Sequence, residues 1–136
     1  MITADVRDWV ADQKQGFTQV VNGPLFNTKR EKLMSIMRGT TLSQPKAIVG
    51  DSSYSRLACN CIIHWNDDYK ETEEKAYQLY EFLMHLEHPV IGGHEVVMIN
   101  MRNFVPLDKD ANNIYEFAID FEIIYKRLKR LESENE

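Results

Sequence analysis

The segment that most constrains the fold is residues 114–126, near the C-terminal end of the chain. Every odd position in it is aromatic or β-branched: Tyr115, Phe117, Ile119, Phe121, Ile123 and Tyr125. Successive side chains of a strand point to opposite faces, whereas a helix would scatter these six around its circumference. The pattern therefore predicts a β-strand with one strongly apolar face.

The other face of this predicted strand is mixed rather than purely polar. Its residues are Ile114, Glu116, Ala118, Asp120, Glu122 and Ile124. Burying a large apolar side chain contributes about 1.5–3 kcal/mol, so leaving a row of them in water is unfavourable. We expect this face to be covered either by an N-terminal helix or by another subunit. In the second case these six residues are the candidate subunit contacts.

The remaining pattern predicts an α+β fold. We expect a short helix at residues 3–13, strands at 32–38, 57–65 and 95–102, a brief strand at 47–49, and a long helix that begins after Asp68 and ends before Pro89. Residues 17–26 are ambiguous. The prediction is a largely antiparallel sheet of about four strands with the long helix packed on one face. Its second face would carry further apolar residues: Ala58, Ile62, Val96 and Met98.

Length and charge limit the possible classes of protein. The 136 residues fit a single domain: an N-terminal helix and connector at 1–29, a core at 30–127, and an acidic tail at 128–136 that we expect to fray. The formal net charge of -5 argues against a general nucleic-acid binder. No apolar run reaches the length of a membrane helix, and the charged N-terminus is unlike a signal peptide. We expect a soluble intracellular protein.

Two groups of side chains have the chemistry of metal ligands. Cys59, Cys61 and His64 offer thiols and an imidazole, but on a strand the cysteines and the histidine face opposite sides, so we expect two buried cysteines that pack as apolar residues. The second group is His85, His88 and His94 around the end of the long helix. No catalytic or phosphate-binding motif accompanies either group, so we expect no metal, no cofactor and no catalytic residue.

A basic cluster follows the last predicted strand. It contains Lys126, Arg127, Lys129 and Arg130. Such a cluster can contact DNA or an acidic partner, although a solvated strand end before an acidic tail is the simpler interpretation.

Several phrases of the sequence resemble the minor capsid proteins of tailed phages, which are similar to tail terminators. They are Lys46–Gly50, Ala58–Asn66, Glu74–Tyr80, Val105–Asp108 and Asn112–Glu116, followed by the closing strand. The resemblance covers roughly residues 30–127. It implies a structural protein without enzymatic activity that forms a ring, hexameric in relatives, at the head–tail junction of the virion. The implied partners are other copies of the chain, the tail-tube protein and head-connector proteins, with DNA passing through the ring unbound. The implied location is the virion, and the host cytoplasm during assembly.

Two other classes of protein remain open at this point. One is a small metal-dependent enzyme that uses His85, His88 and His94. The other is a host-cell adaptor that binds a peptide along an edge of the sheet.

Overall fold

The computed structural model describes residues 1–25, 28–40 and 54–126. The brief strand expected at 47–49 and the acidic tail lie outside these residues. Two helices are present: α1 (Thr3–Asp12) and α2 (Tyr69–Met84). The strands are β1 (Gln19–Asn22), β2 (Leu33–Arg38), β3 (Tyr54–His64), β4 (Val90–Ile91), β5 (His94–Leu107) and β6 (Glu116–Lys126).

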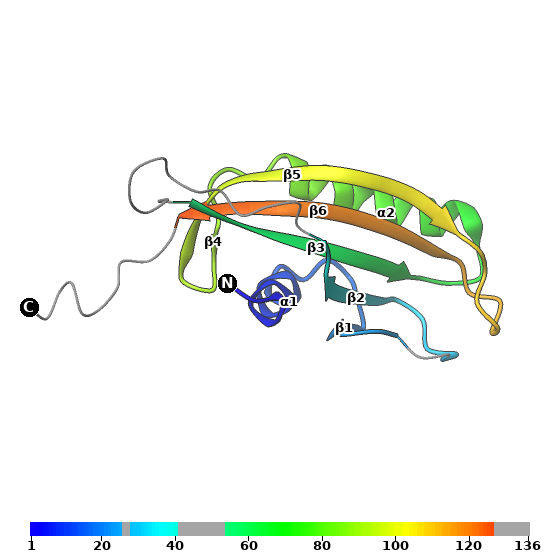
Figure 1. Ribbon diagram of the computed structural model, residues 1–136. Helices are drawn as coiled ribbons and strands as arrows, with labels where there is room; N and C mark the ends of the chain where they lie inside the picture. The colour runs from blue at the N-terminus through cyan, green and yellow to red at the C-terminus, as the bar shows by residue number, and fades with distance from the viewer. Residues whose placement is uncertain (26–27, 41–53, 127–136) are drawn as a thin grey trace, which may run out of the picture.

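The six strands form one mixed sheet in the order β1-β2-β3-β6-β5-β4, curved into a half-barrel (Figure 1). β1 pairs with β2 in parallel, and every other pair is antiparallel. The predicted sheet of about four largely antiparallel strands, with one long helix on one face, is therefore wrong. The two additional strands are short, with four residues in β1 and two in β4, and segments of that length carry too few positions to show a period.

β6 lies inside the sheet, between β3 and β5. Its odd positions from Phe117 to Tyr125 are all buried, as the alternation predicts. The row faces equally apolar neighbours: Phe121, for example, pairs with Cys59 on β3 and with Met101 on β5. These side chains form the centre of the hydrophobic core.

Both helices pack on this same face of the sheet. Val6 and Val10 of α1 belong to the same buried cluster as Leu79 of α2. The rings of Trp9 and Phe82 stack with their centroids 6.1 Å apart, which joins the two helices directly. α1 contacts both edge strands, β1 and β4, as well as β2, so it fills the opening of the half-barrel. The N-terminal helix therefore does not cover the second face of the sheet.

Local capping explains where α2 begins. Asp68 is the N-cap residue, and its side chain accepts a hydrogen bond from the Glu71 backbone N–H at 3.1 Å. On the inner side of the helix, Lys75 donates a hydrogen bond to the Gln15 carbonyl and lies over the ring of Trp65, and burial lowers the pKa of its ammonium group. The helix stops at Met84, several residues before Pro89.

An irregularity in β5 changes which face its side chains occupy. The register shifts between Val96, which pairs with Tyr125, and Met98, which pairs with Ile124. Val96 is fully buried in the core, whereas Met98 is 49% exposed on the opposite face. We expected both residues on the second face because they are two positions apart. That expectation is wrong for Val96, because a β-bulge inserts one residue and reverses the alternation.

Candidate functional site

The face of the sheet opposite the helices is here called the outer face. No helix within the described ranges packs on it. At its centre Ala118 of β6 pairs with Ile62 of β3 on one side and with Val105 of β5 on the other. The β5 side is the more open: Met98, Val105 and Leu107 are 49%, 42% and 37% exposed. The outer face is thus a mixed surface, in which polar side chains such as Asn103 and Asp120 lie between the apolar ones.

The six predicted contact residues are not equally available on this face. Ile114 lies before β6 and is only 3% exposed. Glu122 is buried, with an oxygen 3.8 Å from Nη1 of Arg56. Asp120 is half-buried and accepts a hydrogen bond from the Asn103 side chain. Ala118, Asp120 and Ile124 are therefore the members that contribute to the accessible surface, and Glu116 belongs to a separate cluster.

Only the first residue of the predicted basic cluster can be placed. Nζ of Lys126 lies 3.3 Å from Oε2 of Glu95, with both side chains about half exposed. Arg127, Lys129 and Arg130 lie outside the described residues.

The three histidines proposed as metal ligands do not converge. Nδ1 of His85 lies 2.9 Å from the Glu81 carbonyl, Nδ1 of His88 lies 3.3 Å from the Val96 carbonyl, and Nδ1 of His94 lies 3.2 Å from the Lys126 carbonyl. The helical spacing of His85 and His88 has no effect, because α2 ends at Met84. Across residues 1–25, 28–40 and 54–126, these histidines belong to no group with metal-ligand spacing. The three histidines therefore do not form the metal site that the enzyme hypothesis requires.

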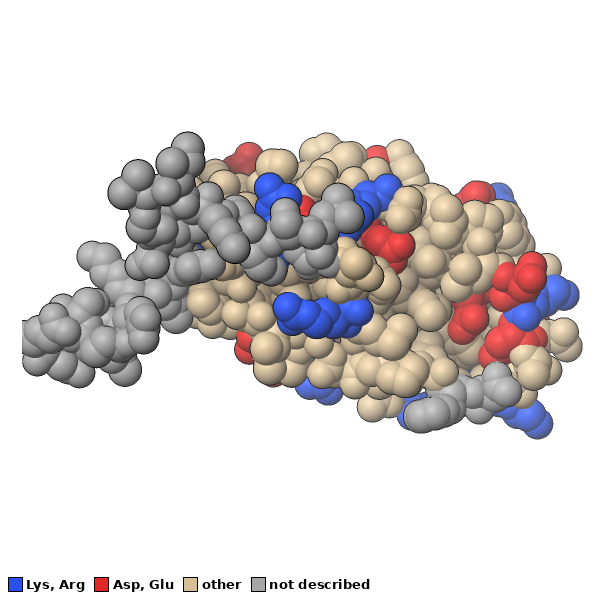
Figure 2. Space-filling model, in the orientation of Figure 1, with Lys and Arg blue, Asp and Glu red and all other residues tan. Residues whose placement is uncertain are grey.

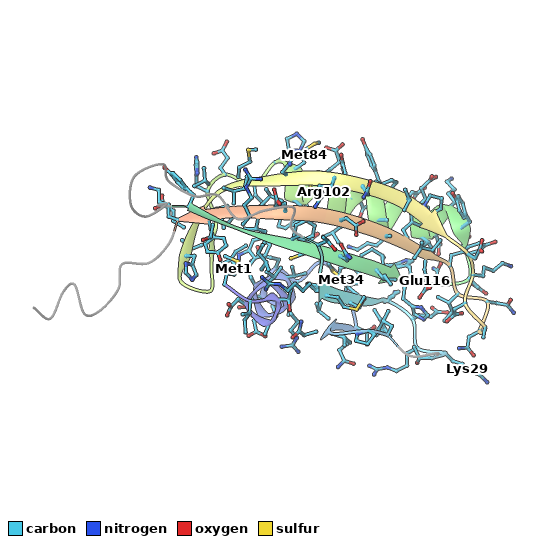
Figure 3. All side chains as sticks on the ribbon, in the orientation of Figure 1. Met1, Lys29, Met34, Met84, Arg102 and Glu116 are labelled. Atoms are coloured by element: carbon cyan, nitrogen blue, oxygen red, sulfur yellow. The ribbon has the colours of Figure 1, made fainter. Side chains whose placement is uncertain are left out.

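A different cluster brings one histidine and two carboxylates together. His64 ends β3, Glu116 begins β6, and Asp110 lies in the β5–β6 connection. Nδ1 of His64 is 2.8 Å from Oε2 of Glu116 and 3.7 Å from Oδ2 of Asp110. The His64 side chain is 1% exposed, and those of Asp110 and Glu116 are 9% and 19% exposed. Figure 3 labels Glu116 near the end of β3, beside this connection.

Sequence reasoning did not find this cluster, because its members are far apart in the chain. His64 was grouped with the cysteines, and Glu116 was assigned to the subunit contact. The antiparallel register of β3 and β6 places His64 directly opposite Glu116. The available signal was the position of each residue at a strand end, which becomes informative only when the pairing register is known.

The two cysteines are buried in the core, as expected, and both are free thiols. Burial raises the pKa of the Cys59 thiol to about 12, and it raises that of Cys61 well above the ordinary value. Because the thiolate is the reactive form, neither residue is suited to nucleophilic chemistry or redox sensing.

We predict that the folded protein does not react with a thiol reagent such as dithionitrobenzoate at pH 8, where both thiols stay protonated and enclosed. In denaturant the same assay should report two thiols per chain, since both side chains then meet water. Rapid labelling of the native protein would show that the strand pair β3–β6 opens readily.

No helix within the described residues is long and apolar enough to cross a membrane. Fold and site together define a sheet-based protein with two helices on one face and, among the described residues, a partly apolar surface without a helix on the other. No catalytic constellation is recognisable in the part of the chain that the structure describes.

The family can then be identified directly. The family model described as "Bacteriophage tail terminator protein" matches residues 32–127, and the chain belongs to this family. The match begins just before β2 and ends just after β6, so it includes every strand except β1. The protein is therefore a structural protein of the phage virion, of a class that interacts with head and tail components.

Other comparisons add little. No curated protein matches the chain. A solved structure with 17% sequence identity aligns with a TM-score of 0.46, covering 93% of this chain and 92% of the other. That likeness is too distant to bear on function.

Proposed function

We propose that the protein assembles into a closed ring, six-membered as its resemblance to ring-forming tail terminators implies, at the head–tail junction, where it caps the tail tube and helps to join head to tail. Its partners are further copies of itself, the tail-tube protein and head-connector proteins. Assembly takes place in the host cytoplasm before the protein becomes part of the virion. The proposal rests on the family and on one structural observation, the large apolar side chains exposed on the outer face, such as Met98 and Val105.

The outer face suits a contact between subunits. Met98 and Val105 are large apolar side chains that are nearly half exposed. Covering them would remove apolar area from water, at about 25 cal/mol per Å². A contact between this patch and a different surface of the next subunit is heterologous, and heterologous contacts close into rings when the rotation permits. On β6, Ile124 pairs with Met98 and Ala118 pairs with Val105, so the face carries two apolar pairs with polar residues between them.

The adjoining edge of β5 offers a second means of contact. β4 pairs only with the first two residues of β5, His94 and Glu95. Among the residues that the structure describes, the remainder of this long strand therefore lies at the edge of the sheet. Edge strands readily pair with another chain through their free N–H and C=O groups. A subunit that docks on the outer face near Val105 would also reach this edge.

The charge of the chain is compatible with DNA passing through such a ring. Neutralising phosphates requires a surplus of lysine and arginine, and this chain has a formal net charge of -5. A negative lumen repels the DNA backbone and limits adhesion during passage. The proposal therefore includes no specific DNA contact.

The decisive experiment measures mass by light scattering over a concentration series, with and without tail-tube protein, and images any large species by negative-stain microscopy. We expect a ring-sized particle at high concentration or when the tube protein is present. A protein that stays monomeric and never binds the tube would overturn the proposal. A monomer in isolation is compatible with it, because ring subunits can wait for their template.

A pair of identical substitutions tests the outer face itself. Val105→Glu places a carboxylate in the proposed contact, where burial without a partner is costly, so we expect at least about a tenfold loss in assembly, or about 1.4 kcal/mol. Val90→Glu is the control, since Val90 is 60% exposed on β4, which pairs with the opposite end of β5 from Val105, and this variant should assemble normally. Equal effects of the two variants in light scattering would move the contact away from the outer face.

The open edge of β5 also supports one other candidate function, a host adaptor that adds a peptide strand to the sheet. A pull-down from infected and uninfected cells separates the two functions. Capture of tail proteins only from infected cells supports the ring, whereas one host peptide captured from both samples supports the adaptor.

A further inference from the structure

We propose that His64, Asp110 and Glu116 form a binding site for one divalent transition-metal ion, with Zn²⁺ as the representative ion. The three donor atoms lie within 4.8 Å of one another. Bound there, the ion would tie the end of β3 to the start of β6 and to the β5–β6 connection. This site lies at the end of the outer face, where Glu116 pairs with His64 and with Leu107, and metal binding there does not require ring formation.

The donor set and its spacing suit such an ion. Imidazole nitrogen and carboxylate oxygen are both zinc ligands, with bonds of about 2.0–2.2 Å and therefore neighbouring ligands about 3.3–3.5 Å apart in a tetrahedron. The observed separations from His64 Nδ1, 2.8 Å to Glu116 and 3.7 Å to Asp110, bracket that range. A tetrahedral ion held by these three ligands keeps a fourth position for water.

An unsatisfied oxygen within the cluster points independently to a ligand. Oδ1 of Asp110 accepts hydrogen bonds from the backbone N–H groups of Asn112 at 2.9 Å and Ile114 at 3.0 Å. Oδ2 faces His64 instead, is buried, and has no hydrogen-bond partner among the described residues. Buried carboxylate oxygens are rarely left unpaired, because their desolvation is then uncompensated. A cation at this position would compensate it.

The charge of the cluster also favours a bound cation. With a neutral imidazole the two carboxylates contribute two negative charges, which a divalent ion balances. Among the described residues neither carboxylate forms an ion pair with lysine or arginine. Figure 2 shows acidic side chains gathered at the end of the molecule where the β5–β6 connection lies. Their field would raise the local concentration of cations.

The simplest alternative is that no metal binds and the imidazole alone pairs with the carboxylates. Nε2 of His64 does not decide between the two, because it lacks a hydrogen-bond partner within the described ranges in either case. The alternative predicts that added metal has no saturable effect, so a titration separates it from the proposal.

The test is calorimetric titration of the full-length, EDTA-treated protein with Zn²⁺. We expect one equivalent to bind and the melting temperature to rise with the free zinc concentration. Asp110→Asn should weaken binding at least tenfold, because the amide oxygen takes over the two backbone hydrogen bonds of Oδ1 and an NH2 group, which does not bind metal, replaces Oδ2. Co²⁺ should bind at the same site and give the visible spectrum of a four-coordinate ion.

The matched control is His85→Gln. Nδ1 of His85 lies 3.3 Å from Oε2 of Glu81 on the exposed surface, so this pair is the obvious place for adventitious zinc. The variant should bind Zn²⁺ as the wild type does. Should Asp110→Asn fail to fold by circular dichroism, Glu116→Gln replaces it. The proposal is overturned by the absence of saturable 1:1 binding, or by unchanged affinity in a folded Asp110→Asn or Glu116→Gln variant.

Discussion

Replacing Ile123 by alanine should lower the free energy of unfolding by about 2–5 kcal/mol. Ile123 is fully buried in β6 and pairs with Leu57 of β3 and Ile99 of β5. Truncating it removes apolar contacts on both sides and leaves a cavity that an interior strand cannot easily close. The measurement is urea unfolding followed by circular dichroism and tryptophan fluorescence.

The neighbouring residue provides the matched control. Ile124→Ala makes the same chemical change on the same strand, but Ile124 is only partly buried and lies on the outer face opposite Met98. We expect a loss of about 1–2 kcal/mol, at the low end because part of the side chain already meets water. Its larger effect should appear in subunit assembly. Similar unfolding losses in the two variants would contradict the assignment of the two faces.

Replacing Gly92 by alanine should also be strongly destabilising, by about 2–5 kcal/mol. Two costs add. Gly92 has φ +59, a conformation that costs an L-residue about 1–2 kcal/mol. A Cβ there would also lie 2.8 Å from both Cβ and Cγ of Asp5, and such overpacking costs about 1–3 kcal/mol. Asp5 belongs to the first turn of α1, where it accepts a hydrogen bond from the Ile2 N–H, so it cannot move freely.

Gly93→Ala is the matched control, because it carries the first cost without the second. Gly93 has φ +80, but a Cβ there would meet no atom within 4 Å. We expect Gly93→Ala to lower the free energy of unfolding only by the backbone cost, about 1–2 kcal/mol. The difference between the two variants in thermal or urea unfolding therefore reports the packing of α1 against the β4–β5 turn. No difference would mean that this contact contributes nothing to stability.

The longest elements of this fold were predictable because each carries a period that local chemistry imposes. The alternation of Phe117, Ile119 and Phe121 indicated a strand buried on one face, and all three side chains are in the core. Helix α2 followed from its apolar spacing and from the cap at Asp68. In both cases the pattern extends over enough residues to distinguish a strand from a helix.

The shorter elements were not predictable for a physical reason. β1 pairs in parallel with β2 across a connection whose described residues contain no helix, and its four residues show no alternation that distinguishes them from a loop. The bulge before Met98 leaves no mark in the sequence, because one inserted residue reverses the faces without changing composition. Strand β1 and the bulge in β5 both depend on pairing with a neighbouring strand, which a single segment of sequence does not show.

The candidate sites also differ in whether the sequence alone could predict them. Ala118 and Ile124 were identified from the strand pattern alone, because an apolar residue among charged ones requires a cover. The cluster of His64, Asp110 and Glu116 was not, because it exists only where the β3–β6 register brings two strand ends together.

The sequence by itself determined which side chains of β6 must leave water and which form a mixed second face, since alternation along a strand is a local property of the backbone. The tertiary structure decided that both helices lie on the same face, so that the mixed face remains accessible. It also decided that distant polar residues meet at the β5–β6 connection. Those outcomes depend on sheet order, curvature and register, which are set by packing between segments far apart in the chain.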